Sequence, residues 1–418
     1  MNNIELFTAA LQLPQPWKVT DVQFVPEGGT KMSLHISIDF ERGAKFTFFR
    51  ENGERVETTA HDTIERKWRH LNFFQYEAYI HARIPRIRDG EGHCLTVNPP
   101  WARKGSGFTL LFEALAMELM RHMPVSVVAR QMGVTDKRLW RVLMHYVDEA
   151  LRLRDYSAVS GIGIDETSRK GHSYITVVVD LETRKVIFAT EGKDHTTVDR
   201  FVENFLRHRG DPGRVRTVTC DMSLGFERGI ADNFPNSNTV IDKFHVVKHA
   251  NEAVDAVRKA ECRENASLRK SKYLWLKNDG NLTARQREWK ASILKGNRHL
   301  KTGRAYSMRV ELQGIYGECR NRDEACGRLV RLCSWMMHSR LDSMKKFCRL
   351  LRGHWDEVLN YFDHRYTNAI LEGINSKIQN VKRRARGFKN IEYFKSLIYL
   401  DCGGLDIDRV LANGIALV

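Results

Sequence analysis

Three acidic residues occupy positions from which their carboxylates could converge on metal ions. Asp165 follows the apolar segment 161–164, Asp221 directly follows the segment 215–220, and Glu372 lies among otherwise apolar and small residues. An acidic side chain in such surroundings is costly unless it is paired or bound to a metal. Two divalent ions roughly 4 Å apart can activate an oxygen nucleophile and stabilise the leaving oxygen of a phosphodiester, and hard ions such as Mg²⁺ favour carboxylate ligands. The three residues therefore predict a metal-dependent phosphodiester chemistry.

Other acidic residues compete for the same role. Asp165 and Asp221 are each a weak signal alone, because Asp often follows a strand merely as a turn residue. The rivals are Glu166, Asp180, Asp199 and Asp242. Asp242 is the best candidate for a supporting role, in which it would orient His245. A structural Asp–His pair explains the same two residues equally well.

The elements that must position these carboxylates form an α/β pattern from residue 160 onward. Apolar segments predict strands over 160–165, 173–180, 185–190, 215–220 and 239–242, and helices over 196–208 and 224–233. The order β-β-β-α-β-α-β is that of a ribonuclease-H-like fold with a mixed five-stranded sheet. The first and fourth strands are neighbours in this topology. Asp165, which closes the first strand, and Asp221, which follows the fourth, should therefore emerge side by side.

Residues 246–360 have a helical and basic pattern, and we interpret them as an insertion before the helix of 366–401, which carries Glu372. Its tryptophans are Trp275, Trp289, Trp335 and Trp355. They either fill the core of the insertion or form an aromatic interface with a second protomer. The basic residues that follow Glu372 are Lys382, Arg383, Arg384 and Arg386. We expect these to hold phosphates beside the scissile bond, and a solvated helix face is the alternative.

The N-terminal part has a different texture. Residues 1–98 are β-rich, with strands predicted over 32–40, 45–49 and 73–80. A helix is expected over 109–122, and the segment 125–147 has the spacing of a helix-turn-helix, with a turn at Gly133 and a second helix capped by Thr135. The residues expected to project from its recognition helix toward DNA are Lys137, Arg138 and Arg141. A helical hairpin in a linker domain is the alternative interpretation.

Five segments follow from these patterns. They are a β-rich DNA-binding domain (1–98), a helix-turn-helix domain (99–155), a first part of the ribonuclease-H-like core (156–245), the helical insertion (246–360), and a second part of the core with the catalytic helix (361–418). A chain of 418 residues is too long for one ordinary core, which agrees with this division.

Composition narrows the class of partner. The net charge of +16 indicates a polyanion such as nucleic acid, and 42% hydrophobic with 28% charged residues excludes a disordered chain. No apolar run is long enough for a membrane span, so we expect a cytoplasmic, nucleoid-associated protein. None of the eight cysteines forms a C-x-x-C pair, which indicates reduced thiols, and Cys319, Cys326 and Cys333 should line one buried helical stripe.

Several long segments carry a resemblance to a known family. They are WRHLNFFQYEAYIHARIPRIR, WARKGSGFTLLFEALA, GIDETSRKGHSY, VTCDMSLGF, VIDKFHVVKHANEAVDAVR and RYTNAILEGINSKIQNVKRRARGFKN. Over nearly its whole length the chain resembles bacterial insertion-sequence DDE transposases of the ISL-three family. The resemblance implies that Asp165, Asp221 and Glu372 are the catalytic triad and bind two Mg²⁺ (or Mn²⁺) ions. It also implies that the N-terminal half recognises the terminal inverted repeats of the element in double-stranded DNA.

The sequence departs from the family pattern in one respect. The family commonly has an N-terminal zinc module with a C-x-x-C-G pair and a later Cys/His pair. Here the segment FRENG (49–53) stands at the first position and only His93 and Cys94 stand near the second. Two ligands cannot hold a structural tetrahedral zinc ion, so zinc is not expected.

Two other functions remain compatible with parts of the sequence. A sequence-specific DNA-binding regulator would need only the helix-turn-helix and the charge. A domesticated, transposase-derived nuclease would keep the triad without moving an element. A transposase must act on two element ends, so a homodimer in the DNA complex is expected.

Overall fold

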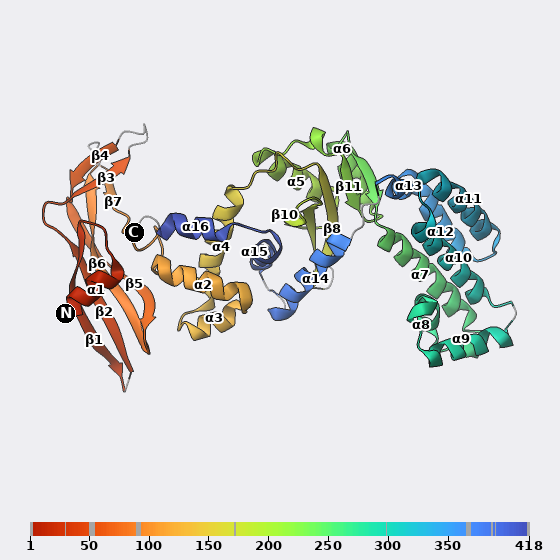
Figure 1. Cartoon of the computed structure of the whole chain (residues 1–418), viewed down its shortest axis with the longest axis horizontal. Coiled ribbons are helices and arrows are strands. Elements are labelled where there is room, and N and C mark those ends of the chain that lie inside the picture. The colour runs from red at the N-terminus through yellow and green to blue at the C-terminus, as the bar shows by residue number, and fades with distance from the viewer. Residues whose placement is uncertain are drawn as a thin grey trace. The chain divides into compact units, whose positions relative to one another are not determined.

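Tertiary contacts divide the chain into two units, Met1–Leu153 together with Leu405–Val418, and Arg154–Gly404 (Figure 1). The computed structural model describes residues 3–29, 31–49, 55–88, 93–170, 173–297, 299–364, 369–385, 388 and 390–415. Within these ranges no helix combines the length and the apolar character that a membrane crossing requires. The segment 50–53, most of the position at which the family has its first cysteine pair, lies outside the described residues.

The first unit is built on a sheet that begins after α1 (Asn3–Leu11). Its strands are β1 (Trp17–Gly28), β2 (Lys31–Phe40), β6 (Tyr76–Arg88) and β5 (Asp62–Phe73) in that spatial order, with β7 (Cys94–Thr96) paired to β6. The hairpin β3 (Lys45–Phe49) and β4 (Arg55–Thr59) forms a separate pair. Leu34, Ile36 and Ile38 of β2 are buried, which confirms the predicted alternation. The strand predicted over 73–80 is confirmed from Tyr76, where β6 begins, but its predicted start is wrong. β5 ends at Phe73, and Phe74 turns the chain with a positive φ of 51°.

The helices of this unit are α2 (Leu110–His122), α3 (Val125–Gln131), α4 (Asp136–Arg152) and α16 (Ile407–Ile415). The Thr109 hydroxyl accepts a hydrogen bond from the N–H of Phe112 and caps α2. Gly133 makes the predicted turn between α3 and α4 with a φ of +68°. Thr135 occupies the N-cap position of α4, but its side chain makes no capping hydrogen bond, so the predicted cap is correct in place and wrong in mechanism.

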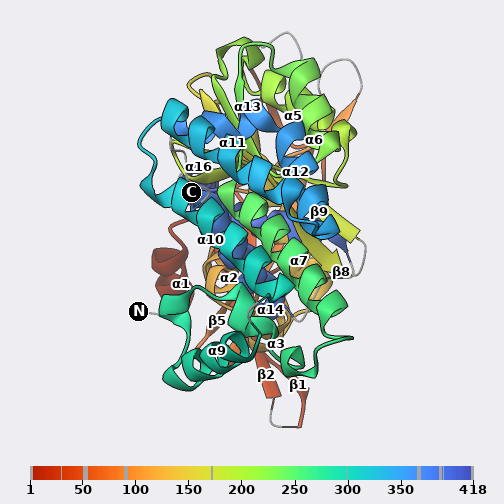
Figure 2. The same cartoon turned by 90° about the vertical axis from the view of Figure 1, so that its right-hand side faces the viewer.

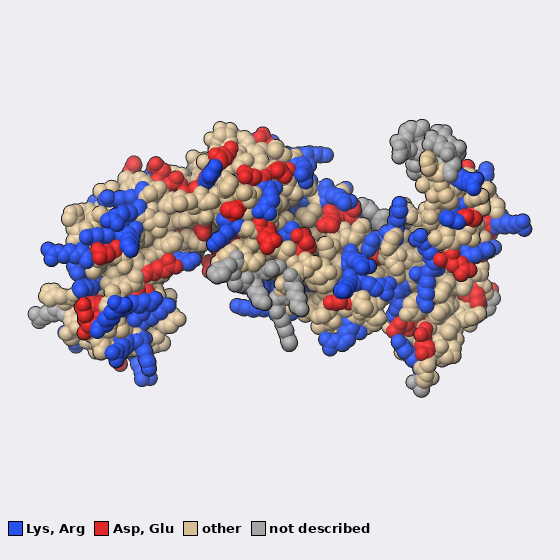
Figure 3. Space-filling model, turned by 180° about the vertical axis from the view of Figure 1, so that it is seen from behind, with Lys and Arg blue, Asp and Glu red and all other residues tan. Residues whose placement is uncertain are grey.

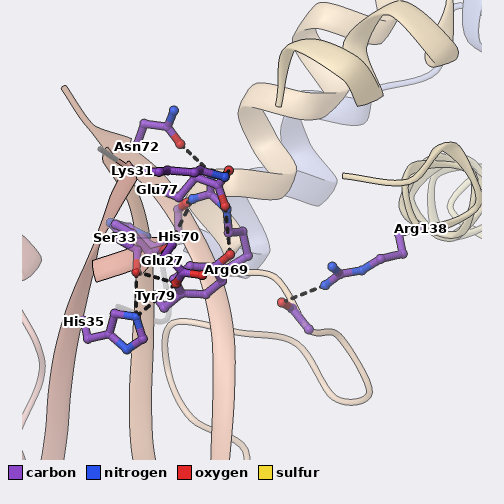
Figure 4. A network of polar contacts seen from close by, with 12 residues as sticks. Glu27, Lys31, Ser33, His35, Arg69, His70, Asn72, Glu77, Tyr79 and Arg138 are labelled. Atoms are coloured by element: carbon purple, nitrogen blue, oxygen red, sulfur yellow. Dashed lines mark hydrogen bonds and ion pairs between the residues drawn. The ribbon is translucent and has the colours of Figure 1, made fainter. Parts of the chain in front are cut away.

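A buried arginine fastens the start of α2 to the sheet (Figure 4). Arg69 of β5 exchanges two backbone hydrogen bonds with the loop before α2, since its N–H donates to Gly107 and its carbonyl accepts from Thr109. Its guanidinium donates to the Ala78 carbonyl on β6 at 3.1 Å and to the Asn72 side chain at 2.5 Å. The helices of this unit are therefore anchored to the edge strand β5.

The second unit contains a mixed five-stranded sheet in the order β10-β9-β8-β11-β12. Its strands are β8 (Gly161–Lys170), β9 (Ser173–Asp180), β10 (Lys185–Glu191), β11 (Thr217–Cys220) and β12 (Asn238–Ile241), with α5 (His195–Arg207) and α6 (Leu224–Asn233) as predicted. β8 pairs antiparallel with β9 and parallel with β11, which confirms that the first and fourth strands are neighbours. Asp165 does not close the first strand, because β8 continues to Lys170 along β9.

The two faces of this sheet differ. Ile162, Ile164 and Val218 lie in an apolar core with side chains of α5 and α6, such as Phe201 and Phe226. The opposite face receives α14 (Ala369–Arg384), which lies along β8, and α15 (Ile391–Cys402), which contacts β10 (Figure 1). On that face β8 begins with Gly161 and Gly163. Because glycine has no side chain, α14 can approach the strand closely.

The insertion begins directly after β12, and its described residues form helices and loops but no strand. Its α-helices are α7 (Lys243–Glu261), α8 (Lys272–Leu276), α9 (Ala284–Gly296), α10 (Lys301–Glu318), α11 (Arg322–His338), α12 (Asp342–Gly353) and α13 (Trp355–His364). α7 packs between α10 and α12 (Figure 2). Trp275 is fully buried and Trp355 is half-buried, whereas Trp289 and Trp335 are 40% and 43% exposed. The tryptophans therefore divide between the core and the surface.

The cysteine predictions can be compared with the same helices. Cys319 and Cys333 are buried and Cys326 is half-buried, which confirms the predicted burial. The single helical stripe is wrong, because Cys319 is the C-cap of α10 whereas Cys326 and Cys333 lie on α11. None of the eight cysteines, all of which the structure describes, forms a disulfide.

Gly163 generates a prediction about the approach of α14. A Cβ atom at this position would lie 2.9 Å from Leu371 Cδ1, 3.0 Å from Thr219 Oγ1 and 3.1 Å from Leu181 Cδ2. We expect Gly163→Ala to lower the free energy of unfolding by about 1–3 kcal/mol, because contacts from three sides leave the methyl group no room. Urea unfolding measures this. Gly327→Ala, on α11 in open space, is the matched control and should stabilise slightly. Equal effects of the two substitutions would contradict the close approach.

Candidate active site

Strand register brings three aspartates to one edge of the second sheet. Thr219 of β11 pairs with Gly163 of β8, and Cys220 pairs with Ile241 of β12. Asp165 comes two residues after Gly163, and Asp221 comes two residues after Thr219. Asp242 comes one residue after Ile241. Because strand side chains alternate between faces, Asp165 and Asp221 share the face that Gly163 and Thr219 occupy, opposite the apolar core. The predicted proximity of Asp165 and Asp221 follows directly from this register.

Asp165 is held by two hydrogen bonds. It is 9% exposed, its Oδ1 accepts a hydrogen bond from the N–H of Glu166 at 2.7 Å, and its Oδ2 accepts one from Asn375 Nδ2 at 2.6 Å. Burial raises the pKa of the Asp165 carboxyl, and the charge of Asp221 adds to this. His245 and the two hydrogen bonds oppose the rise but do not cancel it.

Asp221 and Asp242 lie on either side of His245. Asp221 Oδ2 is 3.9 Å from His245 Nδ1, and Asp242 Oδ2 is 3.8 Å from Nε2. Both distances are too long for hydrogen bonds, so no side-chain hydrogen bond between Asp242 and His245 supports the predicted orientation of His245. Asp242 instead accepts the N–H of Phe244 at 2.9 Å and caps α7. Asp221 Oδ1 is buried and has no hydrogen-bond donor within the described parts of the chain.

Glu372 reaches the same edge from α14. It lines a pocket of about 410 Å³ together with Asp165, Asp242, His245, Asn375 and Arg383. The Glu372 side chain is exposed, so the desolvation argument drawn from its apolar neighbours in sequence is wrong. Among the residues that the structure describes, no three His, Cys, Asp or Glu side chains are close enough together to hold one ion.

The donor set nevertheless fits divalent metal ions. The oxygens at this edge belong to carboxylates, the ligands that hard cations favour. A buried carboxylate oxygen without a donor, such as Asp221 Oδ1, and a carboxyl with a raised pKa, such as that of Asp165, are both stabilised by a nearby positive charge.

Of the rival acids, Asp180 and Asp199 bind groups away from the acidic edge, whereas Glu166 lies close to Asp165 and Asp221. Asp180 accepts hydrogen bonds from the N–H of Glu182 and the hydroxyl of Thr183 in the turn after β9. Asp199 accepts one from Asn233 on α6. Glu166 follows Asp165 on β8, and burial raises its pKa, with the charges of Asp221 and Asp165 adding to the effect.

The basic residues after Glu372 do not all face solvent. Lys382 Nζ donates to the carbonyl of Ser168 at 2.7 Å, and Arg384 pairs with Asp401 at 2.9 Å. Arg383 lines the pocket with Glu372. Arg386 lies outside the described residues.

The basic residues of the helix-turn-helix lie on the exposed side of α4. Lys137, Arg138 and Arg141 are all exposed. The Arg138 guanidinium stacks 4.0 Å from the ring centre of Phe108 and donates to the carbonyl of Gly107 at 3.3 Å (Figure 4). Lys and Arg side chains also cover other parts of both units (Figure 3), so positive charge is not confined to the helix-turn-helix.

Sequence reasoning missed two features of the site. One is the contact of Asn375 with Asp165, for which the only sequence signal is an amide one helical turn after Glu372. The other lies behind Asp221, where Glu227 Oε1 of α6 is 2.8 Å from Nδ1 of the buried His354. Burial raises the pKa of Glu227 to about 7, with the charges of Glu357 and Asp221 adding to the effect.

Comparison with known proteins agrees with this arrangement. Residues 162–398 match the model of a family described as transposase, and residues 97–147 match the helix-turn-helix domain of transposase family ISL3. A transposase for insertion sequence element IS1557 of Mycobacterium tuberculosis is 24% identical over 445 residues, covering 97% of this chain and 96% of the relative. A transposase for insertion sequence element IS1001 of Bordetella parapertussis is 28% identical over 397 residues, covering 91% and 94%.

The sheet, its acidic edge and these matches define the class as DNA transposases, enzymes that cleave DNA and transfer its strands. Within this class the chain belongs to the DDE transposases of family ISL3, which confirms the resemblance seen in the sequence. The family uses divalent metal ions, and the helix-turn-helix domain binds DNA. A DNA-binding regulator would account for residues 97–147 but not for the match over 162–398.

Glu227 generates a prediction about pH. Its carboxyl binds a proton more tightly in the folded protein, where its pKa is about 7, than in the unfolded chain, where it is near 4.5. Stability should therefore fall as pH rises through this window. Glu227→Gln removes the cost of ionisation, so we expect the variant to be more stable than the wild type at pH 8, with the difference shrinking toward pH 5.

Urea unfolding at several pH values measures this difference. Glu203→Gln, at a largely exposed position on α5, is the control and should give no pH-dependent difference. A constant difference between Glu227→Gln and the wild type from pH 5 to pH 8 would contradict the prediction.

Proposed function

We propose that Asp165, Asp221 and Glu372 form the catalytic triad of this transposase and bind two Mg²⁺ (or Mn²⁺) ions. The observation that carries the proposal is the strand register, in which Thr219 pairs with Gly163, two residues before Asp221 and Asp165 respectively. α14 supplies Glu372 to the pocket that Asp165 lines. The core is ribonuclease-H-like, formed by 156–245 and by 361–404, with the helical insertion at 246–360. The predicted second part of the core, 361–418, is too long, because Leu405–Val418 belongs to the first unit.

The residues of the site divide the work. Bound ions would activate water, and then the freed 3′-hydroxyl, for attack at phosphorus and would stabilise the leaving oxygen. Asp165 and Asp221 hold their carboxylates at a fixed spacing because both follow paired strand positions. His245 lies between Asp221 and Asp242 and supports the site by reducing the repulsion between them. Arg383, at the pocket with Glu372, binds the phosphate beside the scissile bond.

The N-terminal unit selects the DNA. Its helix-turn-helix exposes Lys137, Arg138 and Arg141 on α4, where they contact phosphates of the terminal inverted repeats. The β-rich segment 1–98 also contacts DNA. Lys382, Arg384 and Arg386, the other basic residues that follow Glu372 in the sequence, also contact phosphates, although Lys382 and Arg384 bind protein groups as well. The relatives are named as transposases for insertion sequence elements, and this chain mobilises an element of that kind.

The working complex contains two protomers, because one transposition event joins two element ends to one target. A two-fold symmetric dimer is the commonest way to pair two identical sites. Trp289 and Trp335, the exposed tryptophans of the insertion, supply aromatic surface of the type enriched at such interfaces. Repulsion between two basic protomers is relieved by DNA, so the dimer forms on the element ends.

Neutralising any triad residue tests the proposed active site. We expect Asp165→Asn, Asp221→Asn and Glu372→Gln each to lower strand cleavage roughly a thousandfold or more, because the amide keeps the shape but loses the charge that holds the ions. Binding of end DNA should persist. Mapping of nicks on end DNA with Mg²⁺, beside a gel-shift assay, measures both. Asp199→Asn is the control and should keep cleavage. Near-wild-type cleavage by any triad variant removes that residue from the triad.

Salt dependence tests the contacts of the helix-turn-helix. We expect Lys137→Ala and Arg141→Ala each to weaken binding of end DNA. Each should also reduce the slope of log affinity against log salt by about one unit, because binding with one phosphate contact fewer releases fewer counterions. Arg141→Lys keeps the charge and should keep the slope. An unchanged slope in Lys137→Ala and Arg141→Ala would show that this face of α4 only meets solvent.

A further inference from the structure

Three polar contacts fasten α14 to β8. Asn375 Nδ2 donates to Asp165 Oδ2 at 2.6 Å, and Gln379 Nε2 donates to Thr167 Oγ1 at 3.1 Å. Lys382 Nζ then donates to the carbonyl of Ser168 at 2.7 Å. The three donors are spaced four and three residues apart, so they share one face of the helix.

The repeats of the two elements match along this line of contacts. Four helical residues advance about 6 Å, and two strand residues advance about 6.6 Å. The distance along the helix from Asn375 to Gln379 therefore matches the distance along the strand from Asp165 to Thr167. α14 runs in the same direction as β8. One turn earlier, Leu371 lies against Gly163. These contacts therefore set the position of Glu372 along β8.

We propose that Asn375 is a positioning residue of the active site, which fixes the Asp165 carboxylate for metal binding and sets the register of the helix that carries Glu372. This inference rests on the proposed triad. With Oδ1 held by the N–H of Glu166 and Oδ2 held by Asn375, the carboxylate cannot rotate. Each carboxylate oxygen has a second acceptor site, so both remain able to bind a cation.

An amide suits this position better than a charged donor. Lys or Arg beside Asp165 would neutralise the charge that attracts the ions, and Asp or Glu would repel it. Asn donates a hydrogen bond without a net charge, so Asp165 keeps both its orientation and its negative charge. The direction of the contact is unambiguous, since only the NH₂ end of the amide can donate to a carboxylate.

The same helix offers a matched control. Asn380 has the same side chain and lines the same pocket five residues later, but it is exposed and its side chain makes no hydrogen bond to a described residue. A general effect of removing an amide from this pocket should appear at both positions. An effect on the orientation of Asp165 should appear only at Asn375.

Metal binding by the full chain without DNA gives a readout that does not depend on activity. We expect Asn375→Ala to raise the Kd for Mn²⁺, measured by calorimetry, and the Mg²⁺ midpoint of cleavage by about tenfold to a hundredfold, the usual effect of losing a group that orients a metal ligand. Asn380→Ala should leave both unchanged. Binding of end DNA should be unaffected in both variants.

A second variant covers the case in which Asn375→Ala folds poorly. Asn375→Asp puts a carboxylate against Asp165, so Mn²⁺ should raise its Tm more than it raises that of the wild type, because the ion relieves their repulsion. Unchanged Mn²⁺ binding in Asn375→Ala, an equal defect in Asn380→Ala, or a wild-type Mn²⁺ effect in Asn375→Asp would overturn the inference. If Asp165→Asn itself keeps Mn²⁺ binding and cleavage, the proposed triad fails instead.

Discussion

Repulsion between carboxylates on one desolvated edge of a sheet is the constraint around which the second unit is arranged. Asp165 lies within β8, and Asp221 and Asp242 follow the neighbouring strands β11 and β12. Like charges in a poorly solvated place repel strongly. The protein reduces this repulsion only through weak local interactions. The N-terminus of α7 and the N–H of Phe244 stabilise Asp242, and His245 lies between two of the aspartates. None of these neutralises Asp165, whose pKa stays raised.

The backbone around this edge is shaped so that a second element can reach it. Gly163 leaves the space into which Leu371 of α14 packs. The insertion departs from the sheet immediately after Asp242, which is the N-cap of α7. It returns through α13, where Asn360 Nδ2 donates to the carbonyl of Thr239 on β12 at 2.8 Å. Both ends of the insertion are therefore fastened to β12, so more than 100 residues can intervene without disturbing the register of the aspartates.

The sequence predicts those parts of this arrangement that depend on local periodicity. Buried strands such as β9 and β11 read as apolar segments, and their order implied that Asp165 and Asp221 are neighbours. The prediction from sequence fails where strand pairing in the folded protein overrides the local pattern. β8 continues past Asp165 because β9 pairs with its polar second half. The hairpin turn at Phe74 contains no Gly or Pro that would mark it. The bond between Asn375 and Asp165 joins residues 210 positions apart, and only the fold creates it.

Charge alone is an ambiguous guide to DNA contacts in this protein, and the structure shows why. The +16 net charge indicates a polyanion, but it does not say which cations are available to bind one. Lys382 and Arg384 bind Ser168 and Asp401, so part of the basic run after Glu372 holds α14 in place. Lys137 and Arg141 are exposed on α4, and the described residues include no partner that their side chains hold in place as Lys382 and Arg384 do. A cation that fastens the catalytic helix affects chemistry through position, whereas an exposed cation affects affinity through counterion release, and only the second effect depends steeply on salt.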